Sequence, residues 1–73
     1  MPNKLKHRLV LGRSIRDRRR SLNLSQEKLA EKAELSTVFV NRVEAGKENI
    51  SLDATMRVAR ALDVQLRDLV HAI

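Results

Sequence analysis

Cysteine is absent from this sequence of 73 residues, and so are tryptophan and tyrosine. Phe39 is the one aromatic residue, and the one proline stands at position 2. Without cysteine there are no disulfides and no thiolate metal ligands, which suits a reducing, cytoplasmic setting. His7 and His71 lie near opposite ends of the chain. No catalytic constellation, metal site, cofactor or small-molecule effector site is therefore expected.

Long apolar runs are also lacking, since the longest span three residues, at 9–11 and 38–40. A transmembrane helix needs about 20 apolar residues. A signal peptide needs an apolar core after its basic N-terminal residues, and this sequence has no such core there. A chain of this length forms one domain with a modest core. We therefore expect a single non-enzymatic domain over residues 1–73.

The basic residues are concentrated at one end of the chain. Residues 1–20 contain eight Lys and Arg against Asp17 alone, whereas residues 21–73 contain seven basic and eight acidic residues. Such asymmetry favours a polyanionic partner, with nucleic acid first and an anionic membrane second. A membrane-surface helix over residues 4–20 is the weaker alternative because its apolar face is thin. A solvated basic surface without a partner explains the same composition.

The spacing of apolar residues predicts five helices joined by short connections, and no strand. The first helix is expected over residues 8–22, preceded by a flexible segment at 1–7 that has no helix cap. Serine at the cap position starts the helices expected at 25–33, 36–45 and 52–62. A last short helix is expected at 66–72. In the fourth helix we expect the packed residues to be Leu52, Met56 or Thr55, Ala59 and Leu62.

The stretch "STVFVNR" (36–42) resembles a strand because it holds three bulky residues in a row. On a helical wheel, however, Val40 and Val43 lie on one face, and Phe39 lies at its border. Ser36 is a suitable cap at one end and Gly46 stops the helix at the other. We therefore predict a helix whose outer face carries Thr37, Val38, Asn41 and Arg42.

The helices at 25–33 and 36–45 are joined by a tight turn, which is the spacing of a helix-turn-helix. Residues 24–69, "LSQEKLAEKAELSTVFVNRVEAGKENISLDATMRVARALDVQLRDL", resemble the Cro/Xre-type family of lambda-repressor-like domains. With "LGRSIRDRRRSLN" upstream, the resemblance extends over about residues 11–70. Its most specific elements are "LSQEKLA", V-x-x-V-E-A-G-K and "ALDVQLRDL". The "ENISL" stretch is similar to that of short regulators such as the controller proteins of restriction–modification systems.

The resemblance implies an all-α fold of five helices, with the second and third forming the helix-turn-helix. It also implies a transcriptional regulator of double-stranded DNA whose recognition helix, 36–45, enters the major groove. Ser36 is expected to act chiefly as a helix cap, and the alternative for Asn41 and Arg42 is a solvated surface without a DNA contact. The residues expected to contact DNA are Ser25, Gln26, Ser36, Thr37, Val38, Asn41, Arg42, Lys47 and Asn49.

Glu44 lies on the recognition helix, where a carboxylate is unfavourable near phosphates. The resemblance pairs it with Arg19 on the first helix, and we expect a partly buried ion pair. Two positions depart from the family pattern. Glu34 stands where the turn usually has glycine, so a residue with a side chain is expected at positive φ, at a cost of roughly 1 kcal/mol. Arg18 replaces an aliphatic residue, and its stem is expected along the edge of the core.

A single small recognition helix contacts few bases, and half-site symmetry normally supplies the rest. We therefore expect a homodimer formed through the C-terminal helices. The alternative function is an antitoxin-like or adaptor module that binds a protein and for which DNA binding is secondary. The residues expected at the dimer interface are Leu66, Leu69, Val70 and Ile73.

Overall fold

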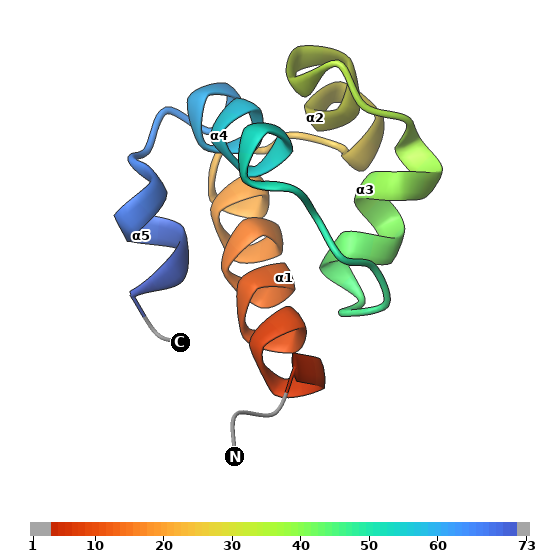
Figure 1. Cartoon of the computed structure of the whole chain (residues 1–73). Coiled ribbons are helices and arrows are strands. Elements are labelled where there is room, and N and C mark those ends of the chain that lie inside the picture. The colour runs from red at the N-terminus through yellow and green to blue at the C-terminus, as the bar shows by residue number, and fades with distance from the viewer. Residues whose placement is uncertain (1–3, 72–73) are drawn as a thin grey trace.

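The computed structural model describes residues 4–71 and confirms the all-α prediction, with five helices and no strand in that range (Figure 1). In Figure 1 α1 runs through the middle of the molecule, with α2 and α3 on one side and α5 on the other. The helices are α1 (Lys4–Ser21), α2 (Gln26–Ala33), α3 (Thr37–Glu44), α4 (Leu52–Ala61) and α5 (Leu66–Val70).

Helix α1 begins four residues earlier than the sequence indicated. Lys4 to His7 are helical, although they were assigned to a flexible segment, while residues 1–3 lie outside the described range. Lysine and leucine are strong helix formers. Once a helix is nucleated, each added residue brings a hydrogen bond without a new nucleation cost. The absence of a cap was therefore a poor indicator of where this helix starts.

The turns around α2 and α3 follow from local chemistry. The Ser25 hydroxyl accepts the Lys28 N–H at 3.0 Å, and the Ser36 hydroxyl accepts the Phe39 N–H at the same distance. Between the two helices Glu34 adopts the left-handed conformation, with φ 57° and ψ 46°, as expected. The Leu35 N–H donates to the Ala30 carbonyl at 2.8 Å, which completes a Schellman motif. These contacts confirm a short turn between α2 and α3.

The core gathers residues from every helix, and α4 contributes most of the face predicted for it. Thr55 is buried as one of the two alternatives, but Leu52 is 65% exposed and Met56 43% exposed. The Thr55 hydroxyl donates to the Ser51 carbonyl at 2.7 Å, so its burial leaves no unpaired group. The prediction is therefore wrong for Leu52, whereas Thr55, Ala59 and Leu62 are buried as expected. The buried apolar residues are Ile15, Leu29, Ala30, Ala33, Val40, Val43, Ala54, Val58, Ala59, Leu62 and Leu69.

Helix α5 packs against α1 and α4 and closes the core on the side opposite α3 (Figure 1). Leu69 is only 2% exposed, so its side chain is used inside its own chain. The prediction that Leu69 contributes to a dimer surface is wrong, because the core needs an apolar side chain there. Leu66 and Val70 are half-buried, and Ile73 lies outside the described residues.

Candidate nucleic-acid interface

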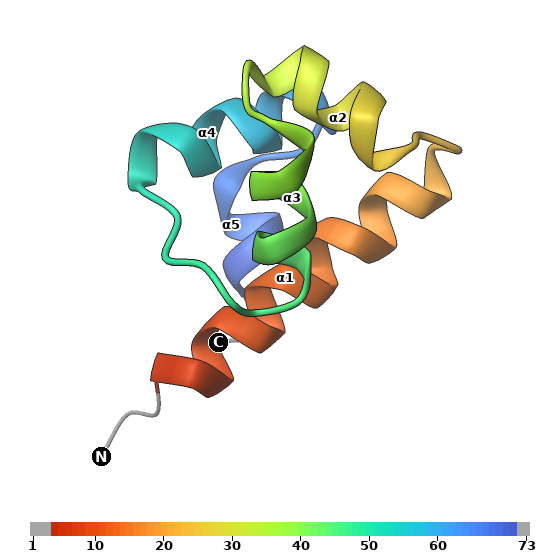
Figure 2. The same cartoon turned by 90° about the vertical axis from the view of Figure 1, so that its right-hand side faces the viewer.

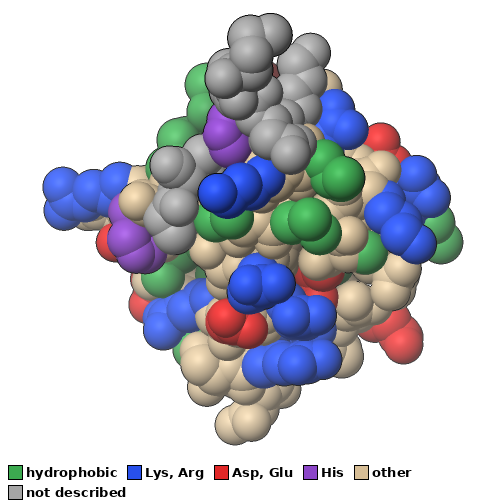
Figure 3. All heavy atoms as spheres, turned by 90° about the horizontal axis from the view of Figure 1, so that it is seen from below, with side chains coloured by type: hydrophobic (Ala, Val, Ile, Leu, Met, Phe, Trp, Pro, Cys, Tyr) green, Lys and Arg blue, Asp and Glu red, His purple; other side chains and the backbone are tan. Residues whose placement is uncertain are grey.

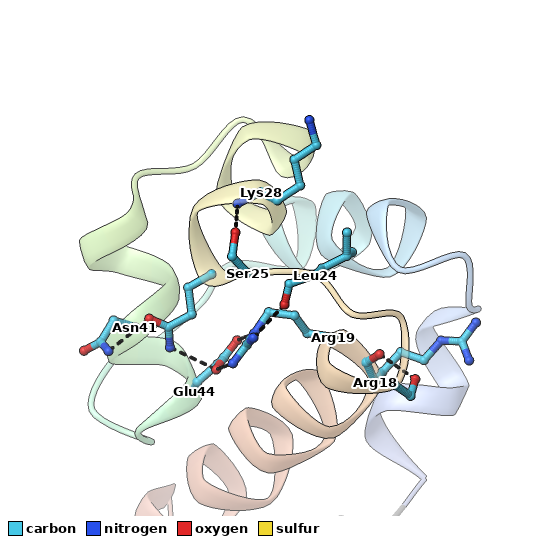
Figure 4. Close-up of polar contacts among 9 residues, drawn as sticks. Arg18, Arg19, Leu24, Ser25, Lys28, Asn41 and Glu44 are labelled. Carbon is cyan, nitrogen blue, oxygen red and sulfur yellow. Dashed lines mark hydrogen bonds and ion pairs between the residues drawn. The ribbon is translucent and has the colours of Figure 1, made fainter.

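A buried ion pair joins α1 to the end of α3 (Figure 4). Arg19 Nε donates to Glu44 Oε2 at 2.7 Å, and Nη2 donates to Oε1 at 2.9 Å. The third nitrogen, Nη1, donates to the Leu24 carbonyl at 2.8 Å. The hydrogen bond to Glu44 raises the pKa of Arg19 above its ordinary value, against the opposing effect of burial. The expected Arg19–Glu44 pair is confirmed, and it is bidentate.

Gln26, the first residue of α2, extends this network toward the outer face of α3. Its Nε2 donates to Glu44 Oε1 at 3.0 Å, and its Oε1 accepts from Asn41 Nδ2 at 3.2 Å. Figure 4 shows this chain of contacts running from α1 across to Asn41. Each of the two amide groups keeps one N–H that these bonds do not use. The network therefore holds α3 in place and orients Asn41 while leaving it a donor for a ligand.

Gly12 allows α1 and α3 to approach each other closely. A Cβ atom at this position would collide with the backbone carbonyl oxygens of Val43 and Glu44. Gly12 itself is buried. Glycine is unfavourable in the middle of a helix by about 1 kcal/mol relative to alanine. Here its missing side chain sets the distance between α1 and the C-terminal turn of α3, just beside the ion pair.

The outer face of α3 is open to solvent. In Figure 2, seen from the side of α3, this helix lies at the front, and the loop to α4 passes beneath its end. Val38 is 69% exposed, which agrees with its expected place on the outer face. Thr37, Asn41 and Arg42 are also exposed. Helical geometry places residues three and four apart on one side, so these side chains form a continuous surface.

Arg42 is linked to the loop that follows α3. Its Nε donates to Glu48 Oε2 at 2.9 Å, and its Nη2 donates to the Lys47 carbonyl at 3.2 Å. The Lys47 N–H in turn donates to the Arg42 carbonyl at 2.9 Å. Lys47 and Asn49 are themselves exposed. Helix α3 and the loop that follows it are thus held together by these hydrogen bonds, and Lys47 and Asn49 lie on the exposed side of that loop.

The basic residues of α1 differ in their contacts and exposure. Arg19 is buried in its ion pair, and Arg18 Nε donates to the Leu62 carbonyl at 3.1 Å. Arg18 therefore caps the C-terminus of α4, where a cation is favourable, in addition to lying at the core edge. Arg13 and Arg20 are exposed. Figure 3 shows Lys and Arg side chains gathered around an acidic side chain on the face seen from below. The basic surface is therefore smaller than the sequence count suggests.

The fold and this surface match a known family, whose model, described as helix-turn-helix (HTH_3), covers residues 15–69. The chain belongs to this helix-turn-helix family. It is 41% identical over 64 residues to the control protein C.BamHI of Bacillus amyloliquefaciens, covering 86% of this chain and 79% of that protein. The crystal structure of the restriction–modification controller protein C.AhdI from Aeromonas hydrophila superposes with a TM-score of 0.84 at 37% identity. That match covers 85% of this chain and 94% of the other. A hypothetical transcription factor, NHTF from Neisseria, superposes with a TM-score of 0.86 at 33% identity, over 96% of this chain and 80% of the other.

In this helix-turn-helix protein the predicted DNA-contacting residues fall into three neighbouring groups. Ser25 and Gln26 lie at the start of α2, the second group begins at the N-cap of α3, and Lys47 and Asn49 follow α3. The hydrogen bond from Asn41 to Gln26 joins the first group to the second. The contact from Arg42 to the Lys47 carbonyl joins the second to the third.

Three residues that support the helix-turn-helix were missed by sequence reasoning: Gly12, Glu48 and Arg57. Gly12 was detectable as a lone glycine inside a run of helix formers, which often marks close packing. Glu48 carried no such signal, because an acidic residue in a loop is ordinarily solvated. Arg57 likewise donates from Nε to the Ala33 carbonyl at 3.0 Å, bracing the turn before α3. Within the described range no helix is long and apolar enough to cross a bilayer.

Proposed function

We propose that this chain is a sequence-specific transcriptional regulator that binds a pseudopalindromic DNA operator as a homodimer, with α3 in the major groove. The observation that carries the proposal is the network of buried Arg19 and Glu44 with half-buried Gln26, which holds α3 with its outer face toward solvent. Similarity to C.BamHI and C.AhdI supports a narrower role, as the control protein of a restriction–modification system. Such a protein acts in the cytoplasm, where its DNA lies.

Three side chains of α3 have the chemistry to distinguish bases. Arg42 carries N–H donors for the O6 and N7 acceptors of guanine. Asn41 keeps Oδ1 and one N–H, the pair that matches N6 and N7 of adenine. Val38 projects an apolar surface suited to a thymine methyl group, and it is 69% exposed.

The flanking groups suit the phosphate backbone. The N-terminus of α2 presents N–H groups and a positive dipole end to an anion, beside Ser25 and Gln26. Lys47 supplies a charge and Asn49 a neutral donor after α3. Ser36 and Thr37 lie at the N-terminus of α3, which is the end that enters the groove in this motif. Together the flanking contacts set the register from which the bases are recognised.

The proposed dimer surface consists of half-buried Leu66 and Val70, with Ile73 beyond the described range. Leu52 and Met56 add exposed apolar area on α4, which packs against α5. These two side chains lie one helical turn apart and so share a face. Apolar side chains that the core does not use are typical of a contact surface.

Selection of binding sites from random DNA tests the proposal. We expect an enriched pseudopalindrome whose half-sites are about one helical turn apart, or a multiple of it. Mapping it against the promoter of the protein's own gene tests the control function. The affinity should fall steeply with salt, with a slope set by the number of phosphates contacted. No enriched site, or an affinity that ignores salt, would favour an antitoxin-like or adaptor module that binds a protein instead.

A further inference from the structure

The guanidinium of Arg42 uses only one of its two hydrogen-bonding edges within the protein. The side edge consists of Nε and the adjacent hydrogen of Nη2. Nε donates to Glu48 Oε2 at 2.9 Å, and Nη2 donates to the Lys47 carbonyl at 3.2 Å. The end edge consists of Nη1 and the second hydrogen of Nη2. These donors have no partner among the described residues, and the Arg42 side chain is 48% exposed.

The two acceptors of the side edge, the Lys47 carbonyl and the Glu48 carboxylate, both belong to the loop that follows α3. The loop is closed onto α3 by the Lys47 N–H, which donates to the Arg42 carbonyl at 2.9 Å. The preceding residue, Gly46, donates to the Val43 carbonyl at 3.0 Å and has φ of 74°. Glu48 is half-buried, with a side-chain exposure of 33%. Arg42 is therefore bonded to the loop through both its backbone and its side chain, which restricts the rotamers of a long residue.

A fixed side edge has a consequence for base recognition. The end edge presents two parallel N–H donors, which is the fork that binds guanine O6 and N7. Ordering an arginine on DNA normally costs side-chain entropy, and pre-organisation removes part of that cost before binding. Because the end edge is free, Arg42 need not release Glu48 to use it. A carboxylate at this place also repels phosphates, which lowers binding to DNA of any sequence.

We propose that Glu48 is a positioning residue for Arg42, holding the side edge of the guanidinium so that its end edge selects guanine. This inference rests on the proposed function of the chain as a DNA-binding regulator. Glu48 strengthens sequence discrimination at the base pair that Arg42 contacts, and it weakens binding to unrelated DNA. The competing role is that of a shield, in which Glu48 occupies Arg42 and must be displaced by DNA.

The experiment measures fluorescence anisotropy of the full chain with two labelled duplexes. One duplex carries the selected operator. In the other, one G·C pair of the operator is replaced, namely the pair whose replacement weakens binding by the wild type but not by Arg42→Ala. Glu48→Ala should weaken operator binding about tenfold and reduce discrimination between the duplexes toward that of Arg42→Ala. Glu48→Gln keeps an acceptor oxygen without the charge and should retain most of the discrimination. Glu31→Ala is the charge-matched control, because Glu31 is exposed on α2 and, among the residues that the structure describes, its carboxylate pairs with Lys28 alone.

A double-mutant cycle separates positioning from general electrostatics. When Arg42 is already alanine, Glu48→Ala should no longer weaken operator binding. Tighter operator binding by Glu48→Ala with unchanged discrimination would overturn the proposal and identify Glu48 as a shield. Loss of discrimination in Glu48→Ala without recovery in Glu48→Gln would also count against it. If the wild-type chain prefers its operator over unrelated DNA, the proposed function stands whatever the Glu48 variants do. If it has no preference, the proposed function itself fails.

Discussion

Arg19 and Glu44 lie 25 positions apart in the sequence and form a bidentate ion pair, with both residues less than one-tenth exposed. Removing one partner leaves a buried charge that water does not reach. Glu44→Ala should therefore lower the free energy of unfolding by about 3–5 kcal/mol. The double variant Arg19→Met with Glu44→Leu should lower the free energy of unfolding much less, because it leaves no unpaired buried charge. Urea unfolding of both variants measures the difference. An unchanged melting temperature and DNA affinity for Glu44→Ala would show that the ion pair does not hold α3 in place.

Gly12 decides how closely α1 approaches the end of α3. Gly12→Ala gains helix propensity, but its methyl group would collide with the Val43 and Glu44 backbone carbonyls, which cannot rotate away as a side chain can. We expect the clash to dominate and the free energy of unfolding to fall by about 1–3 kcal/mol. Ser14→Ala, two residues away on α1, is the matched control and should raise it by a few tenths. A Gly12→Ala protein more stable than wild type would show that the helices separate easily.

Glu34 holds the left-handed position between α2 and α3, at φ 57°. Glycine tolerates this conformation, so Glu34→Gly should raise the free energy of unfolding by about 1 kcal/mol. Glu31→Gly, inside the same helix, should lower it by about as much. Thermal unfolding of the two variants provides the comparison. Equal effects at both positions would mean that the turn carries no strain.

Lys47 and Arg42 should separate phosphate contact from base contact. Lys47→Gln should weaken binding to all duplexes alike and reduce the salt slope by about one unit. Arg42→Ala should instead weaken operator binding by about 1–3 kcal/mol and relax base preference. Binding isotherms at several salt concentrations give both quantities. A base preference that is unchanged in Arg42→Ala would indicate that Asn41 and Val38, and not Arg42, distinguish the bases.

Gln26 contacts both Glu44 and Asn41, so its removal tests the coupling between α2 and α3. Gln26→Ala should weaken binding to all sequences through the lost phosphate contact. It should also reduce any adenine preference that depends on Asn41, because Asn41 loses its orienting acceptor. The same binding-site selection that defines the operator measures this. Unaltered base preference would mean that Asn41 contacts phosphate or solvent.

The proposed dimer makes a separate prediction. Leu66→Glu places a charge on the half-buried edge of α5 and should convert the dimer to monomer, weakening operator binding steeply. Leu22→Glu is the control, because Leu22 is 37% exposed just after α1 and is not one of the residues of the proposed dimer surface. Sedimentation equilibrium at micromolar concentration measures the effect. A wild-type chain that sediments as a monomer under these conditions would exclude the dimer.

Local chemistry explains what was predictable. The caps at Ser25 and Ser36 need only a hydroxyl three residues before a backbone N–H, and both form as expected. The outer face of α3 also followed from periodicity, since Val38 is exposed and Val40 is buried. The Arg19–Glu44 pair was inferred through family resemblance and not from spacing, because 25 residues of intervening chain say nothing about contact.

Other features depended on packing between segments distant in the chain. Apolar residues occur on several sides of α4, so periodicity was compatible with more than one buried face, and packing within the whole domain selected Thr55 over Met56. Leu69 is an apolar residue of the kind found at interfaces, but it is buried in the core of its own chain.

The amino-acid sequence by itself determined the helices, their caps and the helix-turn-helix spacing, because these depend on interactions within a few residues. Only the tertiary structure decided that Leu52 of α4 is exposed while Thr55 is buried, and how Gly12 brings α1 to α3. It also decided that Glu48 holds Arg42, since that contact requires a loop folded back on its helix. Side-chain position across a turn is set by the geometry of the whole domain.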